Sequence, residues 1–328
     1  MDTRAFLAVT CFPLALSLTT GDYTKLNAGE SIVELLPVDE KEVAVRAATQ
    51  TIAHASQLIE WTRQIEELHK GRYVTAIGRF SHPPRIDDLA ALTLDEDDLT
   101  DLRRCRPGRC GVKLNDTEIS QVRAVSATAG ADWKSAVQHT FRAIVLARAE
   151  RYLAEGHAAS ASYHDSKKPV LPDGEFAALA SEVAFMHPRL FPLTNYLSLY
   201  PAGEMLDVES FLYWSKESLG AKPIVSVTHV AMIESRGRQA REALVARKQV
   251  YANHYLLASL SFMAISTSPD GSQRYLVYLN RSRSDVFDGL FGGFIRRTIA
   301  RRLRAEAPRV LDGFRRRIES APPLAGSW

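Results

Sequence analysis

The chain has 328 residues, of which 46% are hydrophobic and 24% are charged, and its formal net charge is +3. This is the composition of an ordinary globular protein, with enough apolar residues for one large domain or two smaller ones. So small a net charge does not indicate a nucleic-acid-binding protein, and we expect no nucleic-acid partner.

Residues 1–20 are typical of a signal peptide. Arg4 precedes an apolar run from Ala5 to Leu18, which is too short to span a bilayer, since spanning needs about 20 apolar residues. Pro13 interrupts the run and no Ala-x-Ala cleavage site follows it, so a buried N-terminal segment is the alternative. We expect a periplasmic or secreted protein.

Residues 21–84 predict a β-α-β unit. Glu42 to Ile52 and Tyr73 to Phe80 have the composition of strands, and Ala53 to Leu68 predicts one helix between them. The helix is predicted because its apolar residues are spaced three and four apart. These residues are Leu58, Trp61, Ile65 and Leu68.

Residues 85–205 predict a region of helices. Thr93 and Glu96 have the spacing of a capping box, which predicts a helix that begins after Thr93. The acidic residues that follow suit the positive end of that helix. A calcium-binding loop is excluded, because Thr100 stands where the loop needs glycine and Arg106 where it needs glutamate.

Two longer helical segments follow in the same region. Trp133 to Leu153 predicts one helix, and Phe176 to Tyr200 predicts a helical segment that is broken at Pro188 and Pro192.

Cys105 and Cys110 flank the turn-forming dipeptide Pro107-Gly108. A tight turn brings the two thiols together, and an even pair of cysteines suits an oxidising compartment. We therefore expect a Cys105–Cys110 disulfide that contributes about 2 kcal/mol by the loop-entropy model. A redox-active pair is the alternative. A metal site is not expected, because the spacing is not Cys-x-x-Cys and no second pair exists.

Residues 206–320 predict an antiparallel sheet followed by a long C-terminal helix, and residues 321–328 form a tail. The predicted strands alternate in polarity and are separated by polar turns that contain glycine. The strands are Val208–Glu217, Pro223–Glu234, Ala243–Ser266 and Arg274–Arg281, and the helix is Leu290–Ser320.

The segment from Val250 to Ile265 is the predicted ligand-binding wall. As one continuous strand it places Tyr251, His254 and Tyr255 as polar tips in a mostly apolar surface, and His229 lies on the neighbouring strand. Ligand cavities are commonly lined in this way. Core residues with satisfied hydrogen bonds are the alternative, and a general-base role for either histidine is also open.

The C-terminal helix has an apolar stripe and an arginine-rich opposite face. The stripe is Ile295, Ile299, Leu303, Val310, Phe314 and Ile318. A basic face that includes Arg301, Arg302 and Arg304 can contact an anionic membrane surface or an acidic partner. A solvated face with no partner is the alternative.

The familiar catalytic and cofactor-binding motifs are absent from the sequence, including Gly-x-Ser-x-Gly, a phosphate loop, His-Glu-x-x-His and the dinucleotide fingerprint. We therefore predict no cofactor and no metal, and the sequence leaves open whether the protein is an enzyme.

Several segments resemble a group of uncharacterised exported bacterial proteins. They are Pro83-Pro84-Arg85, Leu92-Thr93-Leu94, Cys105-Arg106-Pro107-Gly108, Lys248 to Tyr255 and Asn280 to Asp285. The order of elements over residues 42–80 and 208–320 also resembles the helix-grip fold of START-like proteins. That resemblance implies an α+β fold in which a curved antiparallel sheet surrounds a long C-terminal helix, here with residues 85–205 as a large helical insertion.

The same resemblance implies that the protein binds or transports a hydrophobic, lipid-like ligand outside the cytoplasm. The alternatives are a cyclase- or hydrolase-type enzyme on the same scaffold, which would use a cavity histidine, and a protein that docks on a membrane or a partner through its basic helix.

Overall fold

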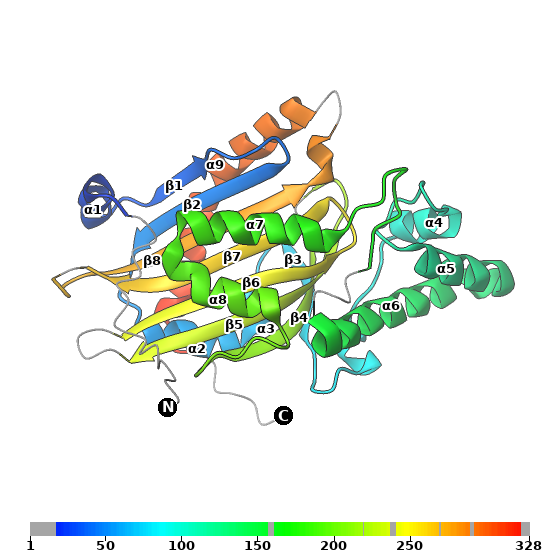
Figure 1. The fold of residues 1–328 in the computed structure, drawn as a ribbon, viewed down its shortest axis with the longest axis horizontal. Coiled ribbons are helices and arrows are strands. Elements are labelled where there is room, and N and C mark those ends of the chain that lie inside the picture. Colours follow the sequence, from blue (N-terminus) through cyan, green and yellow to red (C-terminus); the bar gives the residue numbers. More distant parts are fainter. Residues whose placement is uncertain are drawn as a thin grey trace, which may run out of the picture.

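A computed structural model describes residues 18–156, 161–218, 220–236, 241–268, 270–288 and 292–322 (Figure 1). The predicted leader lies outside these residues apart from its last three positions, and so does most of the predicted tail. Within the described residues, none of the helices has the length and apolar composition that crossing a membrane requires.

The chain forms an eight-stranded antiparallel sheet in the order β1-β2-β8-β7-β6-β5-β4-β3. Strands β3 to β8 follow one another along the chain and pair as neighbours, whereas β2 pairs with β8, so the N-terminal hairpin extends the sheet beyond its last strand. The strands are β1 (Ile32–Leu36), β2 (Glu42–Gln50), β3 (Val74–Arg79), β4 (Glu209–Glu217), β5 (Ile224–Arg236), β6 (Arg241–Ala252), β7 (Leu256–Thr267) and β8 (Arg274–Ser284).

Helices cover both faces of the sheet (Figure 1). The long C-terminal helix α9 (Gly292–Glu319) packs on one face together with α2 (Ala55–Arg63) and α3 (Ile65–Leu68). Helices α1 (Thr20–Asn27), α7 (Pro172–Met186) and α8 (Phe191–Leu199) pack on the other. Both faces are therefore buried, which explains why β7 has almost no exposed position.

Helix α9 contacts both edges of the sheet. Near its start, Arg296 Nη2 donates to the carbonyl oxygen of Val38, between β1 and β2, at 3.2 Å. In its middle, Glu306 accepts a hydrogen bond from the hydroxyl of Tyr73, which precedes β3 at the opposite edge. Helix α9 therefore reaches from one edge of the sheet to the other.

The chain between β3 and β4 is helical, as the sequence predicts. Helices α4 (Glu96–Arg104), α5 (Asp116–Thr128) and α6 (Trp133–Glu155) form a group beside the sheet (Figure 1). They share a hydrophobic core with residues of β4 and β5 that include Trp214 and Val227. The observed architecture is thus an α+β fold with an open antiparallel sheet, a long C-terminal helix and a helical middle region.

Three local predictions are wrong. The predicted helix from Ala53 to Leu68 is two helices, because Gln64 leaves helical geometry with a ψ angle of 53°. The capping box at Thr93 is absent, since the N-cap of α4 is Asp95, whose carboxylate contacts Lys216 Nζ at 2.5 Å. On α9, Val310 is 53% exposed.

The neighbouring residue Leu311 is buried instead of Val310. The buried face of α9 therefore shifts by one residue just after Pro308. The remaining predicted stripe residues of α9 are buried or half-buried.

The predicted strand from Ala243 to Ser266 is also wrong, because the chain reverses within it. Strand β6 ends at Ala252 and β7 begins at Leu256. The turn is completed by Tyr255, whose backbone has a φ of 59°, a left-handed conformation that few non-glycine residues adopt. A run of apolar and aromatic residues with no glycine or proline hides this turn from the sequence pattern.

Helix α1 and strand β1 were not predicted. The β1 sequence Ile32-Val33-Glu34-Leu35-Leu36 is short, and its position is fixed by pairing with β2 and by packing against distant core residues.

Candidate functional site

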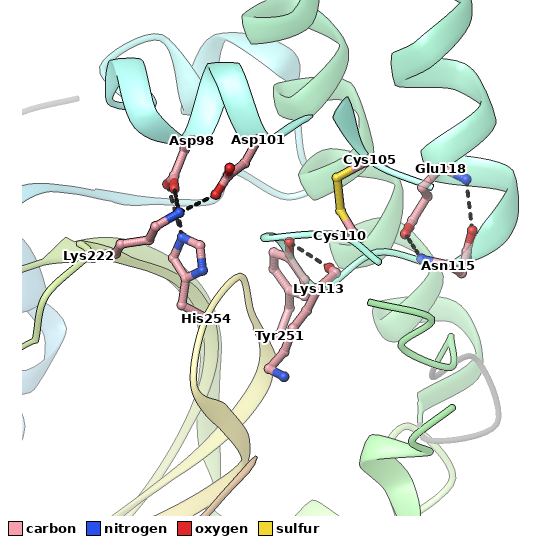
Figure 2. Close-up of a disulfide and its surroundings, with 10 residues drawn as sticks. All are labelled: Asp98, Asp101, Cys105, Cys110, Lys113, Asn115, Glu118, Lys222, Tyr251 and His254. Carbon is pink, nitrogen blue, oxygen red and sulfur yellow. Dashed lines mark hydrogen bonds and ion pairs between the residues drawn. A yellow bond between two sulfur atoms is a disulfide. The ribbon is translucent and has the colours of Figure 1, made fainter. Parts of the chain in front are cut away.

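The structure places Tyr251 and His254 where the end of β6 and the turn after it meet the helical region (Figure 2), and Tyr255 completes that turn. His254 Nε2 lies 2.9 Å from Asp98 Oδ1, and both side chains are only 4% exposed. Asp98 also forms an ion pair with Lys222 at 3.3 Å. The Tyr255 hydroxyl accepts a hydrogen bond from the backbone N–H of Lys222 at 2.9 Å.

Tyr251 is fully buried in the same junction. Its hydroxyl donates to the carbonyl oxygen of Lys113 at 3.1 Å, and the guanidinium of Arg148 lies 4.5 Å from the centre of its ring. Burial raises the pKa of the Tyr251 hydroxyl well above its usual value. These contacts attach the helical region to the sheet, which is the role of core residues with satisfied hydrogen bonds.

His229 lies on the other side of the sheet from α9, among aromatic side chains. Its Nδ1 is 2.8 Å from the hydroxyl of Tyr152, and its ring packs edge-on against Tyr200 at 4.5 Å. Burial, and to a smaller extent the charge of Lys248, lowers the pKa of His229 to about 3. The structure therefore brings together Tyr251, His254 and Tyr255, while His229 belongs to a separate cluster.

The sequence-predicted disulfide joins Cys105 to Cys110 across the Pro107-Gly108 turn (Figure 2). The turn is also held by the backbone, because the N–H of Gly108 donates to the carbonyl oxygen of His164 at 2.7 Å. The disulfide thus closes a loop that is anchored at a second point.

Arg301, Arg302 and Arg304 are exposed on α9. Arg302 pairs with Glu306 of the same helix at 3.2 Å. Within the described parts of the chain, no ion pair joins Arg301 or Arg304 to an acidic side chain.

One group of carboxylates in the described residues has the spacing of a metal site: Asp39, Glu42 and Glu182. Two arginines already contact it. Arg281 Nε lies 2.5 Å from Glu42 Oε1 and its Nη2 contacts Glu182, and Arg283 Nη1 lies 2.7 Å from Asp39. With two cations among these acids, the group is an ion-pair network.

Two surface hollows, of about 620 and 550 Å³, lie on the helical region. The first is lined by Arg103, by residues of α5 and by Gly130. The second lies between α5 and α6. Neither is lined by a sequence-predicted site residue.

A different set of polar side chains lies on the α9-facing side of the sheet. Along β6, Ala243 and Val245 belong to the core beneath α9. Because alternate residues of a strand face the same side, Arg247 and Gln249 continue that row. Arg247 pairs with Val230 of β5, which belongs to the same core. The row therefore changes from apolar to polar beneath the helix.

Arg247 is the centre of this set, which we call the Arg247 cluster. Its charge acts on the four titratable members, which come from β4, β8 and the end of α3. The cluster consists of Arg247, Gln249, Tyr213, Glu217, Tyr278 and His69.

Burial dominates the protonation of the Arg247 cluster. It raises the pKa of Tyr213 to about 12, and it raises the pKa values of Glu217 and Tyr278, while the charge of Arg247 opposes each change. Burial lowers the pKa of His69 well below its usual value, and the charges of Arg247 and Arg317 lower it further. The neutral forms are thus favoured.

Four buried polar atoms of the Arg247 cluster have no hydrogen-bond partner in the described structure: Nε and Nη2 of Arg247, Oε1 of Gln249 and Nε2 of His69. Buried polar groups without partners are rare in native proteins. Glu217, by contrast, accepts a hydrogen bond from the Ser215 hydroxyl at 2.8 Å.

Glu217, His69 and Tyr278 are half-buried. The polar surface continues along β7 and β8, where Ser259 and Ser282 share a hydrogen bond of 2.8 Å.

None of the sequence-predicted site residues belongs to the Arg247 cluster. One signal was available, because an arginine and a glutamine continue the alternation of Ala243 and Val245 on what is otherwise a core-facing row. The other members come from three distant segments, and only the fold brings them together.

Comparison with known protein families, with curated proteins and with solved structures finds no match for this chain.

Proposed function

We propose that this protein binds a small amphipathic ligand between the sheet and α9, at the Arg247 cluster. The observation that carries the proposal is the pair of buried Arg247 donors, Nε and Nη2, that have no partner in the described structure. A buried donor without an acceptor costs about 1–3 kcal/mol, and more when the group is charged. A bound molecule that supplies the acceptor would remove this cost.

The topology supports a ligand at this place. The chain has a β-α-α-β unit followed by a meander and a final helix, and its last strand pairs with the first strand of that unit. This order of elements resembles that of the helix-grip fold. In START-like proteins of that fold, the ligand lies between sheet and helix. The helical region between β3 and β4 is the part that departs from this pattern.

The residues next to the cluster support a ligand with an apolar part. Val230, Val245 and Met263 lie on the same side of the sheet as Arg247 and belong to the core beneath α9. A molecule with a polar head and an apolar body would match this change in polarity. This proposal keeps the hydrophobic ligand expected from the sequence and adds a polar group to it.

We further propose that the ligand is bound outside the cytoplasm. The Cys105–Cys110 disulfide supports this compartment, because disulfides persist in oxidising environments. Sequencing the N-terminus of the mature protein, purified from the periplasm or the medium, would test export. An intact Met1 on cytoplasmic protein would contradict it.

Native mass spectrometry tests ligand binding directly. Wild-type protein should carry a small-molecule adduct, or acquire one from a total bacterial lipid extract. Ser261→Leu should lose it, because Ser261 pairs with Arg247 across β6 and β7 on the same face, and a larger side chain there would occupy the proposed binding site.

Ser120→Leu, on the exposed side of α5, is the matched control and should retain the adduct. Wild-type protein that neither carries nor acquires an adduct would contradict the proposal, and so would equal adducts on Ser261→Leu and the control.

A second candidate function is docking on an anionic membrane surface through α9. Arg301 and Arg304 are exposed, and no acidic side chain of the described residues pairs with them. Phe294, on the first turns of the same helix, is 66% exposed. Cationic side chains beside an exposed aromatic ring suit the interface of an anionic bilayer.

A further inference from the structure

We infer that the ligand carries a carboxylate, and that Arg247 binds this group side-on through Nε and Nη2. The inference rests on the proposed ligand-binding function and names the anchoring group. Two observations support this inference: Nε and Nη2 of the Arg247 guanidinium lack acceptors in the described structure, and few acidic groups of the described residues lie near them.

The two unpaired donors form one edge of the guanidinium. The N–H of Nε and one N–H of Nη2 point in the same direction, so together they present a parallel pair of donors. A carboxylate has two oxygens at the matching spacing, and arginine binds it through two parallel hydrogen bonds. The unpaired atoms of Arg247 are this pair.

No carboxylate of the described chain takes this position. Glu217 acts on Arg247 electrostatically, but no ion pair joins the two side chains, and the Oε1 of Glu217 accepts from Ser215 at 2.8 Å. Burial raises the pKa of Glu217, which favours its neutral form. The arginine is always charged, so its charge is left without a full counter-charge.

The charge of the cluster favours a monoanion. Burial favours neutral forms of Tyr213, Tyr278 and His69, so Arg247 is the one cluster member that retains a positive charge. Arg317, which also acts on His69, already donates from Nη1 to the carbonyl oxygen of Leu68 at 2.5 Å.

A dianion such as a phosphate monoester would bring two negative charges to a cluster whose one cationic member is Arg247. Burying an uncompensated charge is costly. A carboxylate matches the guanidinium in both charge and geometry.

The test compares one ligand with and without its negative charge. The fluorescent fatty acid 11-(dansylamino)undecanoic acid and its methyl ester are titrated into the full-length protein at pH 7. We expect the acid to bind at least about tenfold more tightly, the range of a hydrogen bond to a charged group. This comparison needs no variant, so it does not depend on how a substitution folds.

Variants of Arg247 locate the effect. Arg247→Met should abolish the preference for the acid, and it should fold, because replacing a buried charge by an apolar side chain of similar length is often tolerated. Arg247→Lys keeps the charge but lacks the parallel donors, and it should retain only part of the preference. Lys167→Met, on the exposed surface of the helical region, should retain all of it.

Each outcome has a distinct meaning. Equal binding of acid and ester by the wild type would overturn the carboxylate inference and leave ligand binding in place. A preference that persists in Arg247→Met would place the anion elsewhere and overturn the role of Arg247. If neither compound binds and native mass spectrometry finds no adduct, both the inference and the proposed function are wrong.

Discussion

Nε2 of His254 lies 2.9 Å from Oδ1 of Asp98, and this contact joins the β6–β7 turn to helix α4 (Figure 2). Both side chains are buried, and Asp98 also contacts Lys222 and Asn253. One carboxylate thus connects the helical region to two turns of the sheet.

Replacing Asp98 should loosen this junction. Asp98→Asn retains the shape of the side chain but removes the negative charge that both His254 and Lys222 contact. Hydrogen bonds to charged groups contribute about 2 kcal/mol. We expect a loss of that size in the free energy of unfolding, measured with urea. Asp97→Asn, at the neighbouring exposed position, is the control. Equal unfolding midpoints for the two variants would show that the contact does not stabilise the protein.

His229 should make the protein less stable in acid. Its pKa in the folded protein is about 3, below the usual value of 6.5. As the pH falls below 6.5, the unfolded chain takes up a proton that the folded protein does not, so stability decreases. His229→Gln should reduce the loss between pH 7 and pH 4 by about 3 kcal/mol, since one pKa unit corresponds to about 1.4 kcal/mol.

The unfolding free energy of the wild type and of His229→Gln is measured at several pH values. The slopes of free energy against pH are compared, because the substitution also changes stability at pH 7. The slope should not vanish, because burial also lowers the pKa values of His69 and His187. A slope identical to that of the wild type would contradict the prediction.

Glu217 should have the opposite pH dependence. Burial raises its pKa above 4.5, so the folded protein favours the neutral acid, and stability is lost as the pH rises through the folded pKa. Glu217→Gln should therefore raise the thermal midpoint at pH 7 by about 2 °C and leave it unchanged at pH 4. The exposed Glu204→Gln should change neither value. A lower midpoint at pH 7 would contradict a raised pKa for Glu217.

Removing the disulfide should have a small effect. The ring closed by Cys105 and Cys110 is short, so the double serine variant should lose about 2 kcal/mol and keep its fold. The backbone bond from Gly108 to His164 holds the same turn. Urea unfolding of both forms, with and without reducing agent, measures the change. A wild type that reducing agent does not destabilise would argue against the bond.

Reversing two charges on α9 should weaken binding to anionic vesicles. Each arginine near an anionic surface contributes about 1 kcal/mol, so the Arg301→Glu/Arg304→Glu variant should lose more than about tenfold in affinity for phosphatidylglycerol vesicles. Lys167→Glu/Lys168→Glu makes the same charge change on the helical region and is the control. Equal losses of affinity in both variants would show that net charge alone explains the effect. Docking on a membrane through α9 would then be rejected.

The arrangement of the strands follows from the sequence because hairpin pairing is local. Strand-forming residues in Glu209–Glu217 and in Arg274–Ser284, with polar turns between the strands, are enough to predict a meander. The long amphipathic helix at residues 292–319 is visible for the same reason, since its apolar positions recur with the period of a helix.

The β6–β7 turn shows where local pattern fails. The turn segment Asn253-His254-Tyr255 contains no glycine or proline. The reversal of the chain is stabilised by contacts with residues from elsewhere in the sequence. Asp98 holds His254, and Ser284 donates to the carbonyl oxygen of Tyr255 at 2.8 Å. Residues predicted as a ligand-binding wall therefore lie at a junction between elements.

The sequence by itself determined the α+β class, the meander, the helical middle region, the C-terminal helix and the Cys105–Cys110 pair, because each depends on residues close together in the chain. The tertiary structure alone decided which polar groups meet. Arg247, Glu217, Tyr278 and His69 come from four separate segments, and they become neighbours only when the strands pair and α3 packs on the sheet. The physical reason is that burial and pairing of charge depend on distances in space, which spacing along the chain does not fix.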